Sequence, residues 1–267
     1  MPDKETLQQY QEQTLPANFF PEVQKKYDHG DSLVLTDHGV DFLARNPNFF
    51  TLLNGALQRI DVSIENAVGA QVGMVRKSFE DLLKDHTAPE TVVNDETKES
   101  VTISFLGKGS QSWALLLQVG GEDEKYVIKL PCTKGAYFKL DSPLALLRKG
   151  NQNIPDFPRE MMSSVNIENH FADELKAENL HMPDYLMAGG FFNIARYEGE
   201  TEIPEMAYRH KMVPLATKLA TEISYLGEVE DRPEWRGVFP DWSIAKHDSF
   251  RMRPDGSYVC IDPVSIA

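Results

Sequence analysis

The spacing of hydrophobic residues divides the chain into a helical first third and a second part that begins with β-prone segments. From Val40 to His86 apolar residues recur at intervals of three and four, which predicts two or three short helices with a break near Asn54–Gly55. A short helix followed by a loop is expected before them, in residues 1–35. Residues 87–100 contain Thr, Pro, Asn and four acidic residues, a composition typical of a linker.

After residue 100 the pattern becomes that of a strand meander. Short alternating or apolar runs, separated by turns rich in Gly, predict five strands of one sheet. A helix is predicted between the third and the fourth strand, over residues 158–181. The strands are expected at Val101–Phe105, Trp113–Val119, Tyr126–Leu130, Tyr185–Met187 and Phe191–Tyr197.

The C-terminal part combines one long helix with a hairpin. Apolar residues fall on one stripe from Ala207 to Leu226, and Pro214 either kinks this helix or marks its first turn. The hairpin is expected from Ser249–Met252 and Tyr258–Ile261, on either side of a Pro-Asp-Gly turn.

Charge separates the same two parts of the chain. Residues 1–100 hold 17 acidic and 9 basic residues, a net charge of −8, within a chain whose 41 acidic and 27 basic residues give −14. The predicted fold class is α+β. An acidic helical region of residues 1–100, with its linker, precedes a domain of residues 101–267 that contains a small antiparallel sheet with one inserted helix.

The composition excludes several classes of protein. An acidic surface disfavours binding to nucleic acid or to anionic membranes, because both require clustered Lys and Arg. No apolar run reaches 18 residues and the first residues form no apolar leader, so a cytoplasmic protein is expected. Cys132 and Cys260 are too few for a disulfide framework and are expected to be reduced core thiols.

The segment Gly107-Lys108-Gly109-Ser110 lies between the first two strands predicted for the domain. Phosphate-binding loops of the Walker and dinucleotide types open a helix, so this position argues against both. A glycine hairpin between two strands can instead fold over a triphosphate, because no Cβ atom screens its backbone N–H groups. A plain β-turn is the alternative for this segment.

Lys129 lies in the middle of the third predicted strand, within Val-Ile-Lys-Leu. An ammonium group in an apolar strand must be paired, bind a ligand or reach solvent from an edge strand. Behind a glycine hairpin, the favoured interpretation is a lysine that holds phosphate oxygens and is oriented by a helical glutamate. Glu168 is the favoured partner, because apolar residues follow it on the same helix face, and Glu160 and Glu174 are alternatives.

Three acidic residues near the C-terminus carry further candidate chemistry. Asp241 precedes the loop that leads to the hairpin, where a carboxylate would accept a proton from a substrate hydroxyl. Asp262 follows three β-prone residues at the mouth of the hairpin, a position suited to a divalent metal, and Asp248 would supply a second oxygen ligand for Mg²⁺. The alternative for each residue is an ordinary loop acid that caps a turn.

The order of these parts resembles that of a protein kinase: glycine hairpin, strand lysine, helix acid, long helix, loop Asp and hairpin-end Asp. Residues 101–267 resemble more closely the early-expressed Ser/Thr protein kinases of podovirus-type bacteriophages, through Val-Ile-Lys and the terminal Ile-Asp-Pro-Val-Ser. The resemblance implies a kinase-like fold with a reduced helical C-lobe. It also implies ATP and Mg²⁺ as cofactors, and host bacterial proteins as substrates or targets in the host cytoplasm.

The resemblance also implies a role for each candidate residue. Lys129 would contact the α- and β-phosphates, and the loop from Gly107 to Ser110 would cover the triphosphate. The adenine would lie against the strand end that contains Tyr197. Asp241 would be the catalytic base, and Asp262 would bind Mg²⁺.

The loop after Asp241 departs from the family pattern, which runs Asp-x-His-x-x-Asn. Counted from Asp241, the Asn position holds Lys246, and counted around His247, the Asp and Asn positions hold Ala245 and Phe250. Neither register supplies the Asn, and no activation segment is expected after the Asp-Pro-Val-Ser end. Two alternatives therefore stand beside the kinase: a catalytically weak kinase-like protein that binds and inhibits a host enzyme, and a small-molecule kinase of the aminoglycoside type.

Overall fold

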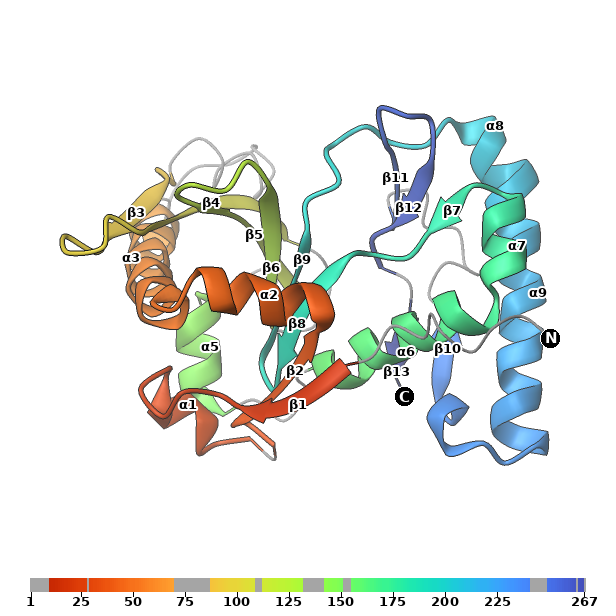
Figure 1. The fold of residues 1–267 in the computed structure, drawn as a ribbon, viewed down its shortest axis with the longest axis horizontal. Helices are drawn as coiled ribbons and strands as arrows, with labels where there is room; N and C mark the ends of the chain where they lie inside the picture. Colours follow the sequence, from red (N-terminus) through yellow and green to blue (C-terminus); the bar gives the residue numbers. More distant parts are fainter. Residues whose placement is uncertain are drawn as a thin grey trace. The chain divides into compact units, whose positions relative to one another are not determined.

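A computed structural model describes residues 10–27, 29–69, 87–108, 112–131, 142–150, 155–240, 249–262 and 264–266 (Figure 1). The chain divides into two compact units. The first, called here the sheet unit, comprises Gln11–Pro158 and Tyr185–Tyr197. The second, called here the hairpin unit, comprises Met1–Tyr10, Arg159–Asp184 and Glu198–Ala267. The predicted boundary at residue 100 therefore does not separate the two units.

The sheet unit is built on an eight-stranded sheet with the strand order β1-β2-β8-β9-β6-β5-β4-β3. The five predicted strands are confirmed as β4, β5, β6, β9 and β8, and they are consecutive neighbours in this order, paired antiparallel. The strands are β1 Tyr10–Thr14, β2 Ser32–Thr36, β3 Glu90–Val93, β4 Ser100–Lys108, β5 Ser112–Val119, β6 Lys125–Pro131, β8 Tyr185–Gly189 and β9 Phe192–Arg196.

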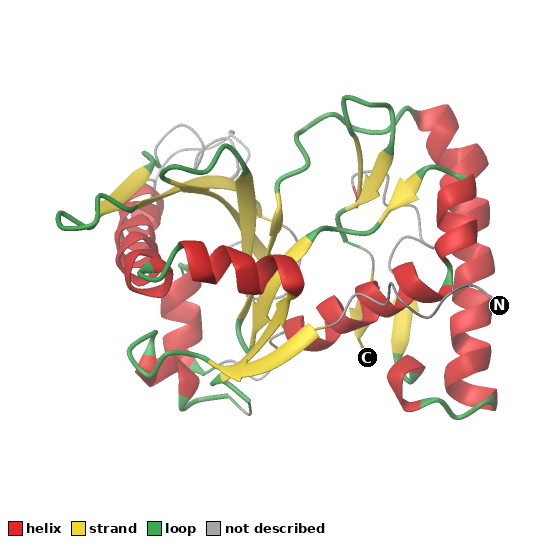
Figure 2. Cartoon of the chain, in the orientation of Figure 1, coloured by secondary structure: helices red, strands yellow, loops and turns green. Residues whose placement is uncertain are grey.

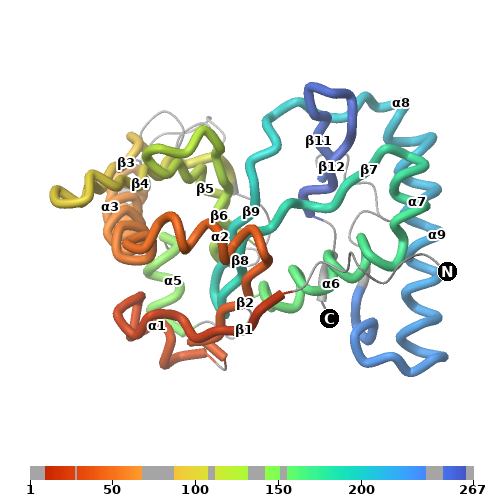
Figure 3. The backbone as a smooth tube through the Cα atoms, in the orientation of Figure 1, coloured from red at the N-terminus to blue at the C-terminus, as the bar shows by residue number. Residues whose placement is uncertain are grey.

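The first hundred residues differ from their prediction, because they supply three strands of this sheet as well as helices. Strand β3 occupies Glu90–Val93, so the interpretation of residues 87–100 as a linker is wrong. Strand β2 pairs with β8, which brings residues 33–35 beside residues 187–189 (Figure 3). The prediction of a loop in this segment is wrong. Leu33-Val34-Leu35 is a short, wholly buried apolar run of the kind that central strands contain.

Helices from the first third and from the middle of the chain complete the sheet unit (Figure 2). They are α1 Pro21–Gln24, α2 Asp37–Arg45, α3 Phe49–Gly69 and α5 Pro143–Lys149. The apolar face of α3, including Leu53, Ile60 and Ile64, packs in one core cluster with Ile103 of β4 and Leu115 of β5. The alternate residues of these strands point to the opposite face of the sheet, away from this core cluster.

Helix α2 is fixed closely against β8 by its N-terminal turn. Thr36 caps the helix by accepting a hydrogen bond from the N–H of Gly39, and its hydroxyl donates to the carbonyl oxygen of Tyr185 at 2.7 Å. A Cβ atom on Gly39 would overlap the backbone carbonyl oxygen of Leu186. Only glycine therefore permits this approach of α2 to the strand.

Replacing Gly39 with alanine is expected to lower the free energy of unfolding by about 1–3 kcal/mol, because neither backbone segment can move without disturbing the core. The matched control is Gly55→Ala in α3, whose added Cβ would meet Val92 at an ordinary 3.4 Å. Glycine weakens a helix interior by about 0.5–1 kcal/mol relative to alanine, so the control is expected to be stabilised. Urea denaturation measures both; a Gly39→Ala protein as stable as wild type would contradict the close approach.

The hairpin unit confirms the predicted hairpin and, in part, the helix predicted over residues 158–181. Its helical part begins with most of α6 Phe157–His170 and continues, after a break at Phe171, with α7 Ala172–Ala177. The end of that prediction is wrong, because Leu180–His181 forms strand β7. Strand β11 pairs with β12, which also pairs in parallel with β7, and β10 pairs with β13. These strands are β7 Leu180–His181, β10 Val238–Pro240, β11 Phe250–Met252, β12 Tyr258–Cys260 and β13 Val264–Ile266.

The predicted long helix is continuous from Glu205 to Val229, and Pro214 lies in the first turn of its central α-helical stretch. A π-helical turn directly precedes that stretch, since proline has no N–H to donate to the carbonyl four residues earlier. The parts are α8 Glu205–Ala207, the π-helix η1 Tyr208–Met212, α9 Val213–Ser224, the π-helix η2 Tyr225–Val229 and, after them, the 3-10 helix η3 Pro233–Trp235.

Two further predictions concern cysteines and membrane spans. Cys260 is buried in the core of the hairpin unit and forms no disulfide with another described residue, as expected for a core thiol. Cys132 lies outside the described residues. Among the helices of the described ranges, none combines the length and the apolar character that crossing a bilayer requires.

Candidate functional site

Lys129 lies in β6, one of the central strands of the eight-stranded sheet. Its register partners are Ala114 in β5 and Asn193 in β9. Residues directly opposite each other in antiparallel strands point to the same face of a sheet. Lys129, Ala114 and Asn193 therefore form one row across three strands, on the face that does not carry the helix-packed core.

A second row on the same face consists of Leu116, Val127 and Ala195, two residues further along each strand. All three are half-buried, as are Ala114 and Lys129. The rows between them, such as Leu115, Ile128 and Ile194, are fully buried against the helices. We call this side of the sheet, defined by Ala114, Leu116, Val127, Lys129, Asn193 and Ala195, the lysine face; all of these residues except the buried Asn193 are half-buried. Small and aliphatic side chains with one cation suit a flat apolar group that carries an anion.

The glycine hairpin is expected between β4 and β5, which are directly paired as predicted. Gly107 pairs with Ala114 after a bulge in the register at Leu106. A Cβ atom on Gly107 would have no neighbour within 4 Å among the described residues, so its backbone is approachable. The main chain of Lys108 belongs to β4, whereas Gly109 and Ser110 lie outside the described residues. The expected strand–loop–strand arrangement is thus confirmed up to the loop itself.

Tyr197 directly follows β9 and continues its pairing with β6. The N–H of Tyr197 donates to the carbonyl oxygen of Lys125 at 2.8 Å, and the Tyr197 side chain is half-buried. The segment expected to meet the adenine therefore belongs to the same unit as Lys129. Its role stays a prediction.

Glu168 lies in α6 of the hairpin unit, half-buried beside Asp184 and Arg253. Burial and the negative charge of Asp184 raise the pKa of Glu168 above its ordinary 4.5, and Arg253 partly opposes them. Because Lys129 belongs to the other unit, its pairing with Glu168 stays a prediction. Of the two alternatives, Glu174 accepts a hydrogen bond from Lys218 at 3.0 Å, and Glu160 lies half-buried in the first turn of α6.

Replacing Glu168 with glutamine is expected to raise the stability of the protein at pH 7. A carboxyl whose pKa is raised on folding contributes stability below about pH 4.5 and loses it as the pH rises through the raised pKa. The difference between the variant and wild type should therefore shrink towards pH 4. Thermal unfolding between pH 4 and pH 8 measures it.

The control for this experiment is Glu174→Gln. The hydrogen bond from Lys218 lowers the pKa of Glu174, so its contribution is present at neutral pH and is lost as the pH falls. The control is therefore expected to be slightly less stable than wild type at pH 7. A Glu168→Gln protein that is also less stable at pH 7 would contradict the burial cost assigned to Glu168.

Sequence reasoning missed an ion pair of the hairpin unit that is joined by two hydrogen bonds and largely buried. Arg253 donates two hydrogen bonds to Glu198, Nε to Oε2 at 2.7 Å and Nη2 to Oε1 at 2.6 Å. Only 5% of the Glu198 side chain and 24% of the Arg253 side chain are exposed. The pair joins the segment after β9 to the turn after β11. No pattern in the sequence links these two residues, since the pairing depends on the tertiary fold alone.

The acidic candidates of the C-terminal part are described only in part. Asp262 is half-buried directly after the β11–β12 hairpin, which is extended by a hydrogen bond from the N–H of Ile261 to the carbonyl oxygen of Ser249 at 2.8 Å. Asp241 and Asp248 lie outside the described residues. Pro240 of β10 pairs with Val264 of β13. The residue before Asp241 is therefore paired with the second residue after Asp262.

The Mg²⁺ site expected at Asp262 stays a prediction. Within the described ranges, no three His, Cys, Asp or Glu side chains gather as a metal site would require. Mg²⁺ usually takes one or two carboxylates, together with phosphate oxygens and water. A site formed by Asp262 with phosphate oxygens would therefore need no such cluster.

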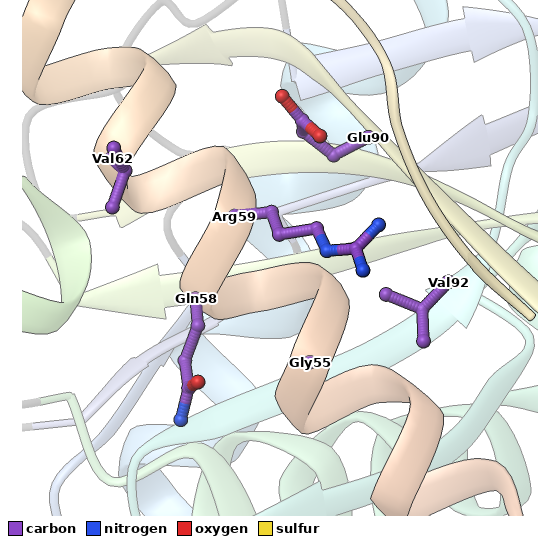
Figure 4. Close-up of a pocket in the computed structure, with 6 residues that line it drawn as sticks. All are labelled: Gly55, Gln58, Arg59, Val62, Glu90 and Val92. Carbon is purple, nitrogen blue, oxygen red and sulfur yellow. The ribbon is translucent and has the colours of Figure 1, made fainter.

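A shallow pocket lies elsewhere, between α3 and β3 of the sheet unit (Figure 4). It has a volume of about 580 Å³, and none of the predicted site residues lines it. The guanidinium group of Arg59 extends from α3 and donates to the carbonyl oxygen of Thr91 at 2.7 Å. This contact ties the edge strand to the helix. The lining residues are Gly55, Gln58, Arg59, Val62, Glu90 and Val92.

Comparisons with known proteins found matches among solved structures alone. No protein-family model matches the sequence, and no curated protein matches it. Among solved structures, the chain is similar to the complex of Rv3197 with erythromycin from Mycobacterium tuberculosis, at 12% sequence identity and a TM-score of 0.28. The similarity covers 85% of this chain and 59% of that one, less than two thirds of its length. A score this low supports no argument about fold or ligand.

Proposed function

We propose that this protein binds ATP with Mg²⁺ and transfers the γ-phosphate to a Ser or Thr hydroxyl of another protein. The observation that carries the proposal is the place of Lys129, in a central strand, on a half-buried face of small residues, directly after a glycine hairpin. Protein kinases use a glycine-rich loop and a lysine on the third strand in this order to hold the phosphates.

Each candidate residue then has a defined part. The backbone of Gly107, Lys108, Gly109 and Ser110 would cover the phosphates, Lys129 would bind the α- and β-phosphate oxygens, and Tyr197 would border the adenine. These groups bind and orient the nucleotide, which supplies most of the catalysis in phosphoryl transfer.

The hairpin unit would supply the acid–base and metal chemistry. Asp241 would accept the proton of the attacking hydroxyl, Asp262 would hold Mg²⁺, and Asp248 would be the second oxygen ligand. The β10–β13 pairing supports this assignment, because it brings together the two strands that precede Asp241 and follow Asp262. Host bacterial proteins enter the proposal through the sequence resemblance alone.

Transfer of label from [γ-³²P]ATP to proteins of a bacterial extract tests the proposal. Wild type with Mg²⁺ is expected to label at least one protein, and Lys129→Ala and Asp262→Asn are expected to reduce the rate about 100-fold or more. Lys125→Ala is the matched control, since Lys125 begins the same strand with an exposed side chain and should leave the rate unchanged. Labelling that survives both site substitutions would overturn the proposal.

A second candidate is a binding protein on the same scaffold that has lost catalysis. The missing Asn in both registers after Asp241 favours it, as does the net charge of −8 on residues 1–100. Much of this acidic region is built into the sheet unit, so the full chain is the object to test. Capture of a basic host enzyme by the full chain, lost at high salt and unaffected by Lys129→Ala, would favour this second function.

A further inference from the structure

Strand β3 has an outer edge that faces away from the sheet. It is the last strand of the eight-stranded sheet, and among the described strands β4 is its one neighbour. The N–H of Asn94 donates to the carbonyl oxygen of Glu99 at 2.8 Å, so Asn94 and every second residue before it direct their backbone groups towards β4. Thr91 and Val93 alternate with these residues and direct theirs to the outer edge. Such groups are the template on which a further strand pairs.

Arg59 of α3 covers one part of this edge. Its Nη1 donates to the carbonyl oxygen of Thr91 at 2.7 Å, which agrees with the outward direction of that carbonyl. A strand that pairs with Thr91 must displace the guanidinium group, because both would donate to the same oxygen. Val93 lies two residues further along, and half of it is exposed. Arg59 is therefore a guard that an added strand has to move.

The shallow pocket beside β3 gives the side chains of an added strand a place to lie (Figure 4). Its volume of about 580 Å³ is within the range of ligand sites. Alternate side chains of a strand point to the same side, so every second residue of an added strand would enter the pocket. One would lie beside the half-buried Val92 and the next beside the half-buried Glu90.

Charge indicates which kind of strand fits this edge. Residues 87–99 contain four acidic residues and one lysine, a net charge of −3 within a chain of −14. Asp95 and Glu96 are exposed at the end of β3, and Glu90 lines the pocket at its start. A second copy of the chain would bring the same acids to the edge, and like charges on paired strands repel. The edge therefore suits a basic partner.

We infer that β3 binds an extended segment of a protein partner, in which apolar residues alternate with Lys or Arg on the side that faces α3. The segment extends the sheet by one strand. Its apolar residue packs beside Val92, and its cations lie near Glu90 and the acidic turn after β3. The inference goes beyond the proposed function, since no residue proposed to bind ATP or Mg²⁺ lines this pocket.

A fluorescein-labelled peptide, Lys-Thr-Val-Thr-Lys-Thr-Val-Thr-Lys, tests the inference by anisotropy titration with the full chain. Its Lys and Val residues share one face, and the sequence is the same in both directions, so it serves for parallel and antiparallel pairing. Binding is expected to saturate and to weaken at high salt. The same peptide with Glu in place of each Lys should bind about tenfold or more weakly, because several cross-strand ion pairs are lost.

Three variants locate the binding at the edge. Val93→Pro removes the N–H that points outward and no hydrogen bond to β4, so it should keep the fold and weaken binding about tenfold or more. Val93→Thr is the matched control, which keeps the N–H and should bind within about twofold of wild type. Arg59→Met should bind more tightly than wild type, because it frees the carbonyl of Thr91 and removes a like charge.

The remaining outcomes would overturn the inference. They are absence of saturable binding, equal binding of the Lys and Glu peptides, full binding by Val93→Pro, and weaker binding by Arg59→Met. Loss of binding in Lys129→Ala would place the peptide at the proposed ATP site instead. A wild-type dimer in sedimentation that Val93→Pro dissociates would make a second copy the occupant. If Val93→Pro fails to fold, the Arg59→Met comparison decides.

Discussion

Replacing Arg253 with methionine is expected to lower the free energy of unfolding by about 3–5 kcal/mol. The two hydrogen bonds from Arg253 hold the carboxylate of Glu198, of which only 5% is exposed. Without them a buried negative charge is left without its partner, and that cost exceeds the worth of the pair itself. Asp184 and Asp255 also interact with the guanidinium group, so its removal adds repulsion among the remaining acids.

Two controls identify the cause of this loss. The double variant Arg253→Met with Glu198→Leu removes both charges and should recover much of the stability. Arg209→Met breaks the pair with Glu205, in which 70% and 56% of the side chains are exposed, and should change the stability by less than about 0.5 kcal/mol. Urea denaturation followed by circular dichroism measures all three. A loss below about 1 kcal/mol for Arg253→Met would contradict the structural role of the pair.

Replacing Lys129 with methionine is expected to weaken MgATP binding about 10- to 100-fold. Hydrogen bonds to charged groups contribute about 1.5–3 kcal/mol, and each 1.4 kcal/mol is a tenfold change in affinity. Methionine keeps the length of the side chain and removes the charge. Lys129 lies on the half-buried face and not in the helix-packed core, and urea denaturation of the variant checks that the fold is kept.

Calorimetry of wild type, Lys129→Met and Lys125→Met measures this effect. The control removes a lysine charge from the same strand at an exposed position, so its affinity should equal that of wild type within about twofold. Equal weakening in both variants would mean that net charge, rather than a contact of Lys129, governs binding.

The strands with a clear period of two were predicted from the sequence, whereas several other elements were missed or misjudged. The break expected near Asn54–Gly55 is wrong, because α3 runs continuously from Phe49 to Gly69. Strand β5 alternates between half-buried and buried residues, so its period of two is visible. Strand β1 is exposed along its whole length and contains no apolar period, so no pattern marks it. Strand β3 has only two valines among acidic and polar residues, and they resemble a linker. Pairing with a neighbouring strand, rather than local pattern, defines both edges.

Helix α5 was not predicted, although the sequence contains signals for both of its ends. Ser142 caps it by accepting a hydrogen bond from the N–H of Ala145, Pro143 begins its first turn, and Gly150 ends it in the left-handed conformation. A Ser-Pro start and a Gly stop mark a helix even where its apolar stripe is short.

The strands around the candidate site were predictable from the sequence. The apolar run around Val-Ile-Lys predicted the strand that contains Lys129, and the β-prone runs before and after the Gly-x-Gly segment predicted the paired strands β4 and β5. The place of the buried Asn193 opposite Lys129 could not be predicted, because it depends on the register of β6 with β9. The same holds for Arg253 and Glu198, whose contact spans 55 residues of sequence.

The central claim is that ATP binds on the lysine face, and photolabelling with 8-azido-ATP tests it most directly. The account predicts labelling that saturates, that unlabelled ATP suppresses, and that maps by peptide sequencing to β5 or to the segment from β9 to Tyr197. The same labelling should be weaker in Lys129→Met. Label that maps to other parts of the chain, or that ATP does not suppress, would contradict the account.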